Sequence, residues 1–340
     1  MTLARLAHAL ETGAIDLSSD ARIVLLEPAP DADLGVIPAR DVTVQHSFKP
    51  TYDLFDTQGV PVTTDATGPA DIVHVTLPRS RELARGLIAQ AEAIAPDGQI
   101  IVDGAKTDGI DAMLKFAKDR VAIDGQLSKA HGKIFWFGAS GAFADCALPD
   151  PAPVTDAWIT QPGVFSADGP DAGSEALIAA LPKSLKGRGA DLGGGWGYLT
   201  KHLLDNPSIT HVDLVEADHR ALTCAGLNLK NSADDRVALH WADATTWGVA
   251  GSLEWVVMNP PFHTSRTPDA SLGQQFIQSA ARLLKPKGTL ILVANRHLPY
   301  ETTLSASFSQ VQELAGDPRF KILQADQPKS SDKPGRAKRR

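Results

Sequence analysis

The sequence predicts an α/β protein with two tandem domains, each built on a mostly parallel sheet that helices cover on both faces. Three observations support this prediction. The chain has 340 residues, which is long for one domain; its second half alternates strand-like and helix-like segments; and its first half repeats part of that layout. The predicted domains are residues 1–150 and 151–326, followed by a basic tail at 327–340, and the prolines of PDPAPV mark the boundary near Leu148–Val154.

Six short apolar segments of the second half are predicted strands. They are residues 190–192, 211–216, 237–241, 253–258, 288–294 and 320–324. Amphipathic stretches near 198–204, 220–229 and 274–284 predict the helices between them. Because ligands of open α/β sheets bind beyond the carboxyl ends of the strands, the residues after each strand are the first candidates for function.

The first half carries a weaker copy of this pattern. DIVHVTLP at 71–78 resembles EWVVMNPP at 254–261, and APDGQIIVDG at 95–104 resembles KPKGTLILVA at 285–294. The copy has no glycine-rich loop, and TLPR stands where the second half has NPPF. We interpret residues 1–150 as a duplicated, degenerate domain that supports packing and recognises substrate; chance recurrence of a common strand–turn pattern is the alternative.

Composition excludes several classes of protein. Hydrophobic residues make up 43% and charged residues 21% of the chain. No apolar run approaches roughly 18 residues, the length of a membrane helix, and the N-terminus has no signal-peptide core. We therefore predict a cytoplasmic monomer without membrane contact. Cys146 and Cys224 fit neither a disulfide framework nor a zinc site, and no histidine has a metal-ligand spacing, so we predict no bound metal.

The charge of the chain is unevenly distributed. The net charge of −7 argues against a protein that coats nucleic acid, whose affinity comes from neutralised phosphates. Residues 1–150 hold 21 acidic and 13 basic side chains, whereas residues 151–340 hold 19 acidic and 20 basic ones. The final segment, DQPKSSDKPGRAKRR, contains six basic and two acidic residues. We hypothesise that the tail adds phosphate contacts; a solvated tail with no partner is the alternative.

A glycine-rich turn follows the first strand of the second half. ADLGGGWGYLT contains Asp191-x-Gly193-x-Gly195-x-Gly197 between an apolar strand and a helix. Glycine allows a sharp turn and close approach of the backbone to a ligand. A dinucleotide fingerprint needs a small residue where Tyr198 stands, which disfavours a dehydrogenase. The spacing instead resembles the first motif of class I S-adenosylmethionine methyltransferases; a glycine-rich turn without a ligand is the alternative.

Two acidic residues follow the next strands. Glu216 ends the strand HVDLVE, 19 positions after Gly197, where a carboxylate can accept hydrogen bonds from both hydroxyls of a ribose. It is a predicted cofactor contact together with Ala217. Asp243, followed by Ala244, lies just past the third strand, where class I methyltransferases often hold the adenine amino group. A turn or helix N-cap aspartate is an equally compatible interpretation.

The segment VVMNPPFH, residues 256–263, resembles the [N/D]-P-P-[F/Y/W] motif of enzymes that methylate planar amino groups. Such a nitrogen has a delocalised lone pair, so acceptors that orient the NH2 group matter more than a strong base. Asn259, through its side-chain oxygen, and Pro260, through its carbonyl, can supply them. Pro261 fixes the turn, and Phe262 can stack on a flat base. His263 can contact the base or simply belong to the turn, and a proline turn that only closes a strand is the alternative for the whole motif.

With both motifs, the chain resembles the ribosomal RNA small subunit methyltransferase C family of tandem-domain guanine-N2 methyltransferases. The likeness rests on QPGVFSADGPDAGSEAL, DLGGGWGYL, NPPFH, LKPKGTLILVANRHLPY and an echo in SKAHGKIFWFG, and spans about residues 70–325. It implies two Rossmann-like methyltransferase domains, the first degenerate and the second with a seven-stranded, mostly parallel sheet. It also implies conversion of S-adenosylmethionine to S-adenosylhomocysteine and methylation of a guanine amino group in ribosomal RNA or a ribosomal subunit.

The resemblance implies further contacts. Those beside the cofactor would be Phe165, Ser166, Asp168 and Gly169, and those on the substrate side would be Asn295, Arg296 and the segment Leu298–Tyr300. Gly194, where the family often has cysteine, belongs to the cofactor loop. The basic extension after Pro328 departs from the family pattern.

Other functions share parts of these motifs. Large-subunit guanine-N2 methylation, protein-glutamine N5 methylation and adenine N6 methylation use the same amino-group chemistry, and the duplicated inactive domain favours the ribosomal RNA family over the last two. A catalytically silent RNA-binding module would explain the first half but not both motifs of the second. The motifs identify neither the modified nucleotide nor its subunit.

Overall fold

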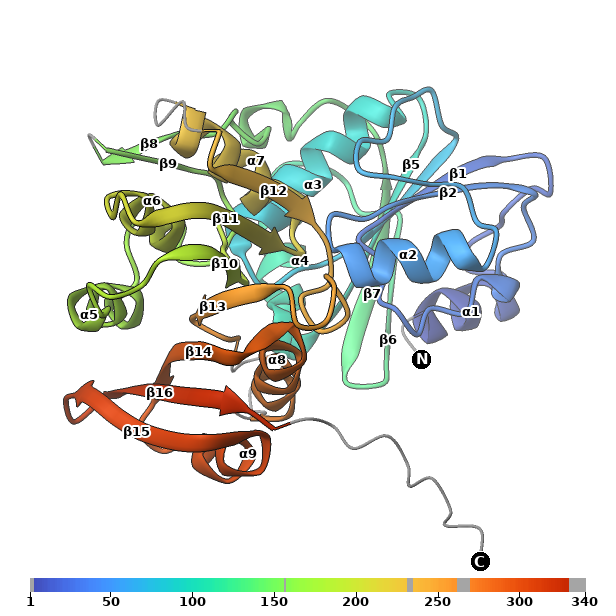
Figure 1. The fold of residues 1–340 in the computed structure, drawn as a ribbon. Helices are drawn as coiled ribbons and strands as arrows, with labels where there is room; N and C mark the ends of the chain where they lie inside the picture. The colour runs from blue at the N-terminus through green and yellow to red at the C-terminus, as the bar shows by residue number, and fades with distance from the viewer. Residues whose placement is uncertain (1–2, 156, 231–234, 262–269, 330–340) are drawn as a thin grey trace, which may run out of the picture. The chain divides into compact units, whose positions relative to one another are not determined.

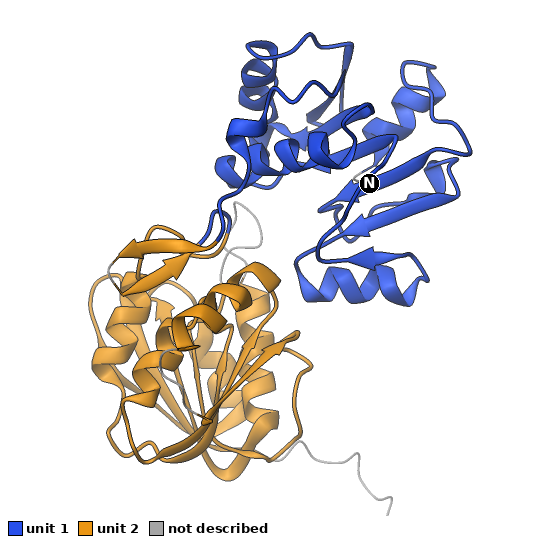
Figure 2. Cartoon of the chain, turned by 90° about the horizontal axis from the view of Figure 1, so that it is seen from above, with its two compact units in different colours: residues 1–150, 161–163 blue, residues 151–160, 164–340 orange. Residues whose placement is uncertain are grey.

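The computed structural model describes residues 3–155, 157–230, 235–261 and 270–329. The chain forms two compact units: unit 1 holds residues 1–150 and 161–163, and unit 2 holds residues 151–160 and 164–340 (Figure 2). Each unit has its own sheet with helices packed on it (Figure 1), which confirms the predicted fold class. Among the described residues, no helix is both long and apolar enough to span a bilayer.

Unit 1 is built on a seven-stranded sheet with the order β3-β2-β1-β4-β5-β7-β6. Strands β1 to β5 pair in parallel, whereas the β5–β7 and β7–β6 pairs are antiparallel. The strands are β1 (Arg22–Leu26), β2 (Asp41–Gln45), β3 (Val62–Thr63), β4 (Ile72–Thr76), β5 (Gln99–Ala105), β6 (Gly125–Lys129) and β7 (Gly132–Gly138). The helices are α1 (Ala4–Glu11), α2 (Lys49–Thr57), α3 (Arg81–Ile94) and α4 (Ile110–Lys118), with short 3-10 turns at 34–36, 106–108 and 144–146.

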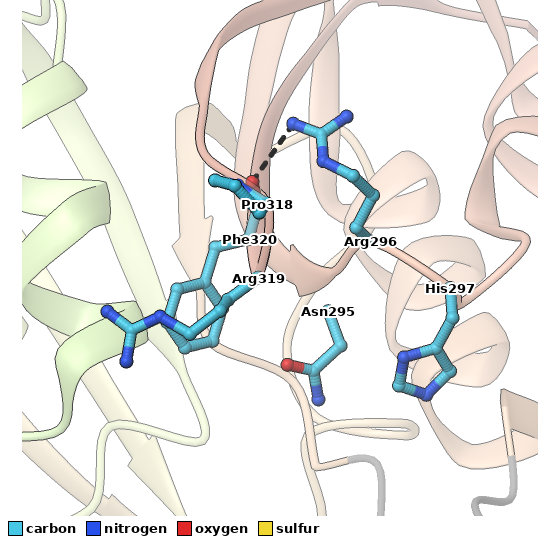
Figure 3. Close-up of a pocket in the computed structure, with 6 residues that line it drawn as sticks. All are labelled: Asn295, Arg296, His297, Pro318, Arg319 and Phe320. Carbon is cyan, nitrogen blue, oxygen red and sulfur yellow. Dashed lines mark hydrogen bonds between the residues drawn. The ribbon is translucent and has the colours of Figure 1, made fainter.

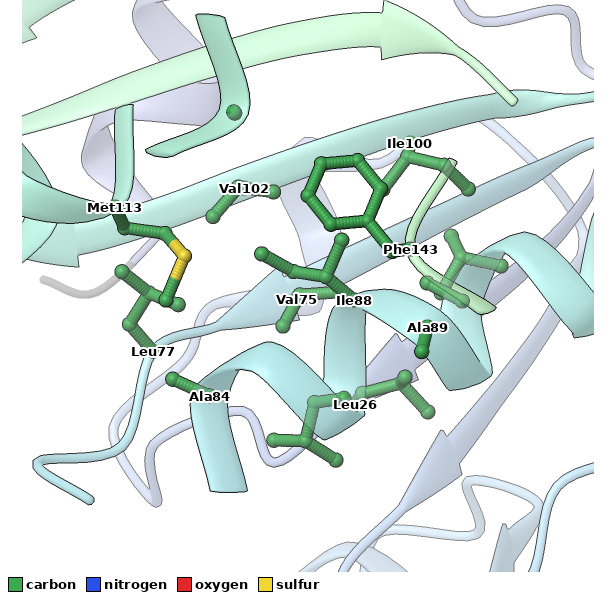
Figure 4. Packing of buried hydrophobic residues seen from close by; sticks show 14 of the residues in the cluster. Leu26, Val75, Leu77, Ala84, Ile88, Ala89, Ile100, Val102, Met113 and Phe143 are labelled. Atoms are coloured by element: carbon green, nitrogen blue, oxygen red, sulfur yellow. The ribbon is translucent and has the colours of Figure 1, made fainter. Parts of the chain in front are cut away.

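Two apolar clusters cover the two faces of this sheet. One contains Val24 and Val102 and packs against α3 and α4 (Figure 4). The other contains the alternate strand residues Leu25 and Ile101, together with Phe55 of α2. Because successive side chains of a strand point to opposite faces, strands buried between two helix layers are mostly apolar on both faces. Unit 1 therefore has a complete core of its own.

Unit 2 has a second seven-stranded sheet, with the order β12-β11-β10-β13-β14-β16-β15. Its strands are β10 (Gly187–Leu192), β11 (Ile209–Glu216), β12 (Val237–Trp241), β13 (Leu253–Met258), β14 (Leu284–Asn295), β15 (Phe308–Gly316) and β16 (Phe320–Pro328). Its helices are α5 (Ala172–Ala180), α6 (Tyr198–Leu204), α7 (His219–Lys230), α8 (Ala270–Leu283) and α9 (Tyr300–Ser307). A separate antiparallel hairpin joins β8 (Ala152–Thr155) to β9 (Trp158–Thr160).

The two sheets have the same strand order when their strands are matched along the chain, so that β1 corresponds to β10, β4 to β13 and β5 to β14. The repeated segments at 71–78 and 95–104 contain β4 and β5, which occupy the places of β13 and β14. The repeated layout therefore extends over all seven strands, beyond the two segments in which the sequence shows it.

Strand β10 lies where the strand order of unit 2 reverses direction. It pairs in parallel with β11, where Leu192 lies opposite Val215. It also pairs in parallel with β13, where Asp191 lies opposite Val257. Because these three strands run the same way, the loop after β10 and the turn after β13 leave the sheet at one edge. The topology thus brings residues 193–197 and the segment that begins at Asn259 to the same side of the sheet.

The end of the sheet differs from the predicted domain boundary. Strand β16 runs to Pro328, which lies opposite Phe308 of β15, and the N–H of Lys329 donates to the carbonyl of Ser307 at 2.8 Å. Gln327 and Pro328, which the sequence placed in the tail, therefore complete the edge ladder of unit 2. Residues 330–340 of the predicted tail lie outside the described residues.

Candidate active site

The glycine-rich loop joins β10 to α6 and contains three glycines with left-handed backbone. The φ angle is +72° at Gly193, +54° at Gly195 and +89° at Gly197, values that residues with a Cβ rarely adopt. The N–H groups of Gly193 and Gly194 both donate to the carbonyl of Val215, at 2.8 and 3.1 Å. The loop is therefore anchored on the neighbouring strand β11, and its glycines are required by the backbone.

Gly194 and Gly195 face different surroundings. A Cβ on Gly194 would lie 2.6 Å from Cγ of Leu214. Gly194 therefore packs closely against β11, and a larger residue would require Leu214 to move. A Cβ on Gly195 would meet no described atom within 4 Å. The main chain at Gly195 therefore borders open space that a ligand can fill.

Asp191 lies beneath this loop and is fully buried. Its Oδ2 accepts a hydrogen bond from the Thr200 hydroxyl at 2.7 Å, whereas its Oδ1 has no hydrogen-bond partner among the described residues. Burial raises the pKa of Asp191 to about 7, and the nearby Glu216 carboxylate adds to the increase. A buried carboxyl oxygen without a partner is costly, so this position suits a ligand that brings a positive charge or a donor.

Glu216 follows β11 and contacts the same loop. Its Oε2 accepts from the N–H of Gly195 at 2.8 Å, and its Oε1 accepts from the N–H of Asp218 at 2.7 Å. Burial raises the pKa of Glu216. Each carboxylate oxygen can accept a second hydrogen bond, so Glu216 can hold ligand hydroxyls beside the loop. The neighbouring carbonyl of Ala217 accepts from Trp241 Nε1 at 2.8 Å.

Asp243 has a local role in this structure. Its Oδ1 accepts from the N–H and the hydroxyl of Thr245, at 2.8 and 2.7 Å. This is the turn-aspartate geometry that the sequence left open as the alternative to an adenine contact. Ala244 is buried and packs in the apolar cluster around α8.

Asn259 comes directly after β13, and its side-chain amide is held by two acceptors. Nδ2 donates to Asp171 Oδ2 and to the Ser174 hydroxyl oxygen, both at 2.9 Å. Asp171 is also the N-cap of α5, because its Oδ2 accepts from the N–H of Ser174 at 2.9 Å. The start of α5 therefore fixes the Asn259 side chain at the carboxyl edge of the sheet.

A single pocket is lined by residues from both motifs. Its lining residues are Phe165, Ser166, Asp171, Ser174, Gly193, Gly194, Gly195, Trp196, Tyr198, Leu199 and Asn259. The glycine loop and the segment that begins at Asn259 leave the sheet at one edge, and the structure places Asn259 and Gly193–Gly195 around this common pocket. Pro260 is buried and Pro261 is half-buried beside it, whereas Phe262 and His263 lie outside the described residues.

Two residues of the turn at 165–169, Phe165 and Ser166, line this pocket. Trp196 Nε1 donates to the carbonyl of Phe165 at 2.9 Å, and the Phe165 side chain is 57% exposed at the pocket. Ser166 has a φ of +52°, and its hydroxyl donates to the carbonyl of Gly169 at 2.7 Å. Asp168 and Gly169 belong to the turn but are not among the residues that line the pocket.

A second pocket lies at the end of β14 and is lined by Asn295, Arg296, His297, Pro318, Arg319 and Phe320. Figure 3 shows Arg296 turned toward the main chain of Phe320, with Asn295 and His297 turned away from it. The Arg296 guanidinium donates to Glu313 at 2.8 Å and to the carbonyls of Asp317 and Phe320 at 2.7 and 3.1 Å. Arg296 therefore braces the β15–β16 turn in this structure.

Tyr300 is buried within unit 2. It begins α9, has no exposed surface and belongs to the apolar cluster around α8, and Leu298 is also buried. A Cβ on Gly273 of α8 would lie 1.9 Å from the Tyr300 hydroxyl oxygen. The chain turns back after β14 and packs this ring between α8 and α9, so Tyr300 lines neither of the two pockets described above, and its place on the substrate side stays a prediction.

Neither cysteine lines the pocket. Cys224 is buried, and burial raises the pKa of its thiol to about 11, so the thiol is inert at neutral pH. Burial also raises the pKa of Cys146 in unit 1. Within the described ranges, no group of three or more histidine, cysteine, aspartate or glutamate side chains is arranged to hold a metal ion.

Sequence reasoning missed Asp171, Ser174, Trp196, Tyr198 and Leu199 as pocket residues. A signal for the first two was present, because Asp171-Ala-Gly-Ser174-Glu175 is an N-cap pattern before a helix. The pattern predicts a helix start at Asp171. It does not predict that the same carboxylate reaches Asn259, 88 positions further along the chain.

Unit 1 has different residues at the matching positions. Glu27 and Pro28 follow β1 where the glycine loop follows β10, and Thr76 ends β4 where Asn259 follows β13. Gln45 ends β2 as Glu216 ends β11, and its Oε1 accepts from the N–H of Ala66 and from Gln90 Nε2, both at 2.8 Å. The place of the Glu216 carboxylate is thus taken by an amide engaged within the unit.

Comparison with known proteins gives matches over most of the chain. The model of the methyltransferase small domain family matches residues 157–324. The ribosomal RNA small subunit methyltransferase C of Shewanella baltica (strain OS155) is 30% identical over 264 residues, which cover 74% of this chain and 75% of that protein. The protein of the same name from Shewanella oneidensis is 29% identical over 268 residues, with the same coverage.

A solved structure shares the whole fold. The T. thermophilus 16S rRNA N2 G1207 methyltransferase, in complex with AdoMet and guanosine, superposes with a TM-score of 0.76 at 22% identity. The alignment covers 96% of this chain and 93% of that protein. Both halves of this chain are therefore similar to a known two-domain architecture.

Proposed function

This chain belongs to the ribosomal RNA small subunit methyltransferase C family, and we propose that it transfers the methyl group of S-adenosylmethionine to the N2 amino group of a guanine in small-subunit ribosomal RNA. The observation that carries this proposal is the common pocket, in which the amide of Asn259 lies beside the glycine loop. A direct transfer requires the methyl donor and the target amino group to meet, and the shared pocket of Gly193–Gly195 and Asn259 supports this proposal.

The residues around the loop fit the cofactor. Oδ1 of Asp191, which has no hydrogen-bond partner within the described part of the chain, suits the ammonium group of the methionine moiety, and Glu216 suits the ribose hydroxyls. The open space at Gly195 lets the ligand approach the main chain. When bound, S-adenosylmethionine supplies an electrophilic methyl group on a sulfonium centre.

Asn259 and Pro260 act on the amino group of the target base. Their side-chain and main-chain oxygens accept hydrogen bonds from the NH2 group, which turns its lone pair out of the ring plane and toward the methyl group. The same acceptors stabilise the positive charge that develops on nitrogen. The proton that nitrogen then loses is acidic and can leave to water, so no strong base is required.

The affinity for S-adenosylmethionine is expected to depend on pH through Asp191. Because the pKa of this carboxyl is raised to about 7, it is mostly neutral below that pH and has to lose its proton to pair with an ammonium group. The dissociation constant should therefore fall about tenfold per unit as pH rises from 5.5 toward 7, and level off above. Isothermal titration calorimetry between pH 5.5 and 7.5 measures this.

The matched variant for that titration is Asp191→Asn, which keeps the shape of the side chain but cannot ionise. It should bind S-adenosylmethionine more weakly at pH 7.5, with a nearly flat pH profile. A wild-type dissociation constant that does not change over this range would contradict the assignment of Asp191 to the ammonium group.

The proposed function is tested with small ribosomal subunits from cells that lack this gene. Purified protein and labelled S-adenosylmethionine should introduce N2-methylguanosine at one position of the small-subunit RNA, identified by nuclease digestion and mass spectrometry. Label in large-subunit RNA, in N6-methyladenosine or in protein glutamine would each overturn the proposal in favour of that substrate. RNA binding without any transfer would indicate a catalytically silent module.

Unit 1 and the tail would then serve the RNA. Unit 1 retains the sheet without the cofactor residues, which supports a role in structure and substrate recognition. Residues 330–340 contain five basic residues and one acidic residue, so truncation after Lys329 should weaken RNA binding several-fold and flatten its salt dependence. Binding measured between 50 and 200 mM salt checks this, with unchanged S-adenosylmethionine affinity as the control. An unchanged salt slope would mean that the tail is solvated and has no RNA contact.

A further inference from the structure

We propose that Asp171 is a positioning residue that sets the orientation of the Asn259 amide, so that its carbonyl oxygen and not its NH2 group faces the target nitrogen. This inference rests on the proposed function, in which Asn259 acts as a hydrogen-bond acceptor. Asn259 carries one acceptor and one donor group on the same planar amide, and a rotation of 180° exchanges them. Something in the fold has to select one orientation.

The two contacts of Nδ2 are not equivalent in this respect. Asp171 Oδ2 and the Ser174 hydroxyl oxygen both lie 2.9 Å from Nδ2. A hydroxyl can donate as well as accept, so Ser174 is compatible with either orientation of the amide. An ionised carboxylate only accepts, and a rotated amide would place two acceptor oxygens about 2.9 Å apart. Asp171 therefore discriminates between the orientations, and Ser174 does not.

Asp171 is itself held in place by the helix that it caps. The oxygen that accepts from Asn259 also accepts from the N–H of Ser174 at 2.9 Å, which anchors the carboxylate on the first turn of α5. The negative charge is favourably placed at the amino end of this helix. Ser174 is 7% exposed, and a Cβ on Gly173 would lie 3.3 Å from the Phe320 ring, so the first turn is packed against the sheet. The orienting charge is thus fixed relative to β13.

The size of the effect follows from the kind of hydrogen bond. A hydrogen bond to a charged group favours the orientation that makes the bond by roughly tenfold to a hundredfold over the orientation that loses it. Without Asp171, a substantial part of the protein would present the Asn259 NH2 group to another NH2 group. The rate would fall in proportion, while cofactor binding by the glycine loop would not.

The test uses Asp171→Gly, because glycine is an acceptable N-cap whose cost to the helix is small. We expect kcat to fall at least about twofold, because the two orientations of the amide then become about equally populated, with the dissociation constant of S-adenosylmethionine unchanged. Ser80→Gly is the matched control: Ser80 caps α3 of unit 1 through a hydrogen bond from the N–H of Leu83 at 3.3 Å. It makes the same kind of change in another helix and should leave kcat unaltered.

A second pair of variants separates orientation from general support. Asn259→Asp should lower kcat about a hundredfold in the presence of Asp171, because two carboxylates then face each other. Adding Asp171→Gly to Asn259→Asp removes that repulsion and should raise kcat about tenfold. Asp171→Gly thus lowers kcat in the wild-type protein and raises kcat in the Asn259→Asp protein. A merely structural role for Asp171 would lower both by a similar factor, and that result, or full activity of Asp171→Gly alone, would overturn the proposal.

Thermal unfolding of the free variants makes the test independent of the substrate. Asn259→Asp should lower the unfolding temperature, and adding Asp171→Gly should recover part of the loss. If this recovery is seen but wild-type protein methylates no guanine, the contact stands and the proposed function fails. If wild-type protein methylates guanine N2 but neither kcat nor the unfolding temperature shows the reversal, the proposed function stands and Asp171 has no positioning role.

Discussion

Replacing Asn259 with alanine is expected to lower kcat by about 100- to 1000-fold, the range seen when one preorganised hydrogen-bonding group is removed from an active site. The substitution deletes the side-chain acceptor that orients the amino group and leaves only the main-chain carbonyl of Pro260. The glycine loop, Asp191 and Glu216 are untouched, so the dissociation constant of S-adenosylmethionine should stay within a factor of about two to three.

Steady-state rates and calorimetry on the same preparations check this expectation. Asn206→Ala is a suitable control in the same unit, because the Asn206 amide donates to the carbonyl of Leu185, away from the pocket. That variant should keep its kcat. An Asn259→Ala protein with wild-type turnover would remove the side chain from the mechanism.

Gly195→Val is expected to weaken S-adenosylmethionine binding by roughly a hundredfold or more. The φ of +54° at Gly195 is unfavourable for any residue with a Cβ, and most unfavourable for a β-branched one. The new side chain would also extend into the space that borders the loop, where no described atom lies within 4 Å of the Cβ position. Backbone strain and blocked space thus act in the same direction.

The matched control for this substitution is Gly251→Val. Gly251 belongs to the same unit, has a φ of +67° and would likewise meet no described atom within 4 Å of an added Cβ. It precedes the start of β13, whereas Asn259 follows the end of the same strand. Both variants should lose similar unfolding free energy, but only Gly195→Val should lose cofactor affinity. Equal affinities in the two variants would show that the space at Gly195 is not the cofactor site.

The sequence predicted the central strands best because their signals are local. Strand β13 at 253–258 and helix α6 at 198–204 have the predicted bounds, since an apolar run ends at Asn-Pro-Pro and a helix starts after Gly197. Strand β15 was missed because it is a largely exposed edge strand, so FSQVQELAG has no apolar alternation. Helix α5 was missed although Asp171 supplies an N-cap signal, because its segment, AGSEALIAA, is short and has little amphipathic periodicity.

The candidate site was predictable as far as parallel topology determines it. Two motifs at the carboxyl ends of β10 and β13 have to lie at one edge of the sheet, and the pocket lined by Gly195 and Asn259 agrees with that expectation. Residues that reach the pocket from elsewhere were not predictable. Asp171 contacts Asn259, which lies 88 positions further along the chain. Tyr300 comes soon after the end of β14, but its ring is buried in the core. Neither arrangement produces a periodic pattern in the sequence.

The shared strand order of the two units has a consequence for how this chain can change over time. Unit 1 keeps all seven strands and two apolar clusters although proline and glutamate follow β1 in place of glycines. The scaffold therefore holds its shape without a glycine-rich loop after its first strand. Residues at the carboxyl edge of a sheet can be substituted, and binding specificity can change, while the buried layers stay the same. Unit 1 can therefore diverge in specificity while unit 2 keeps its residues for catalysis.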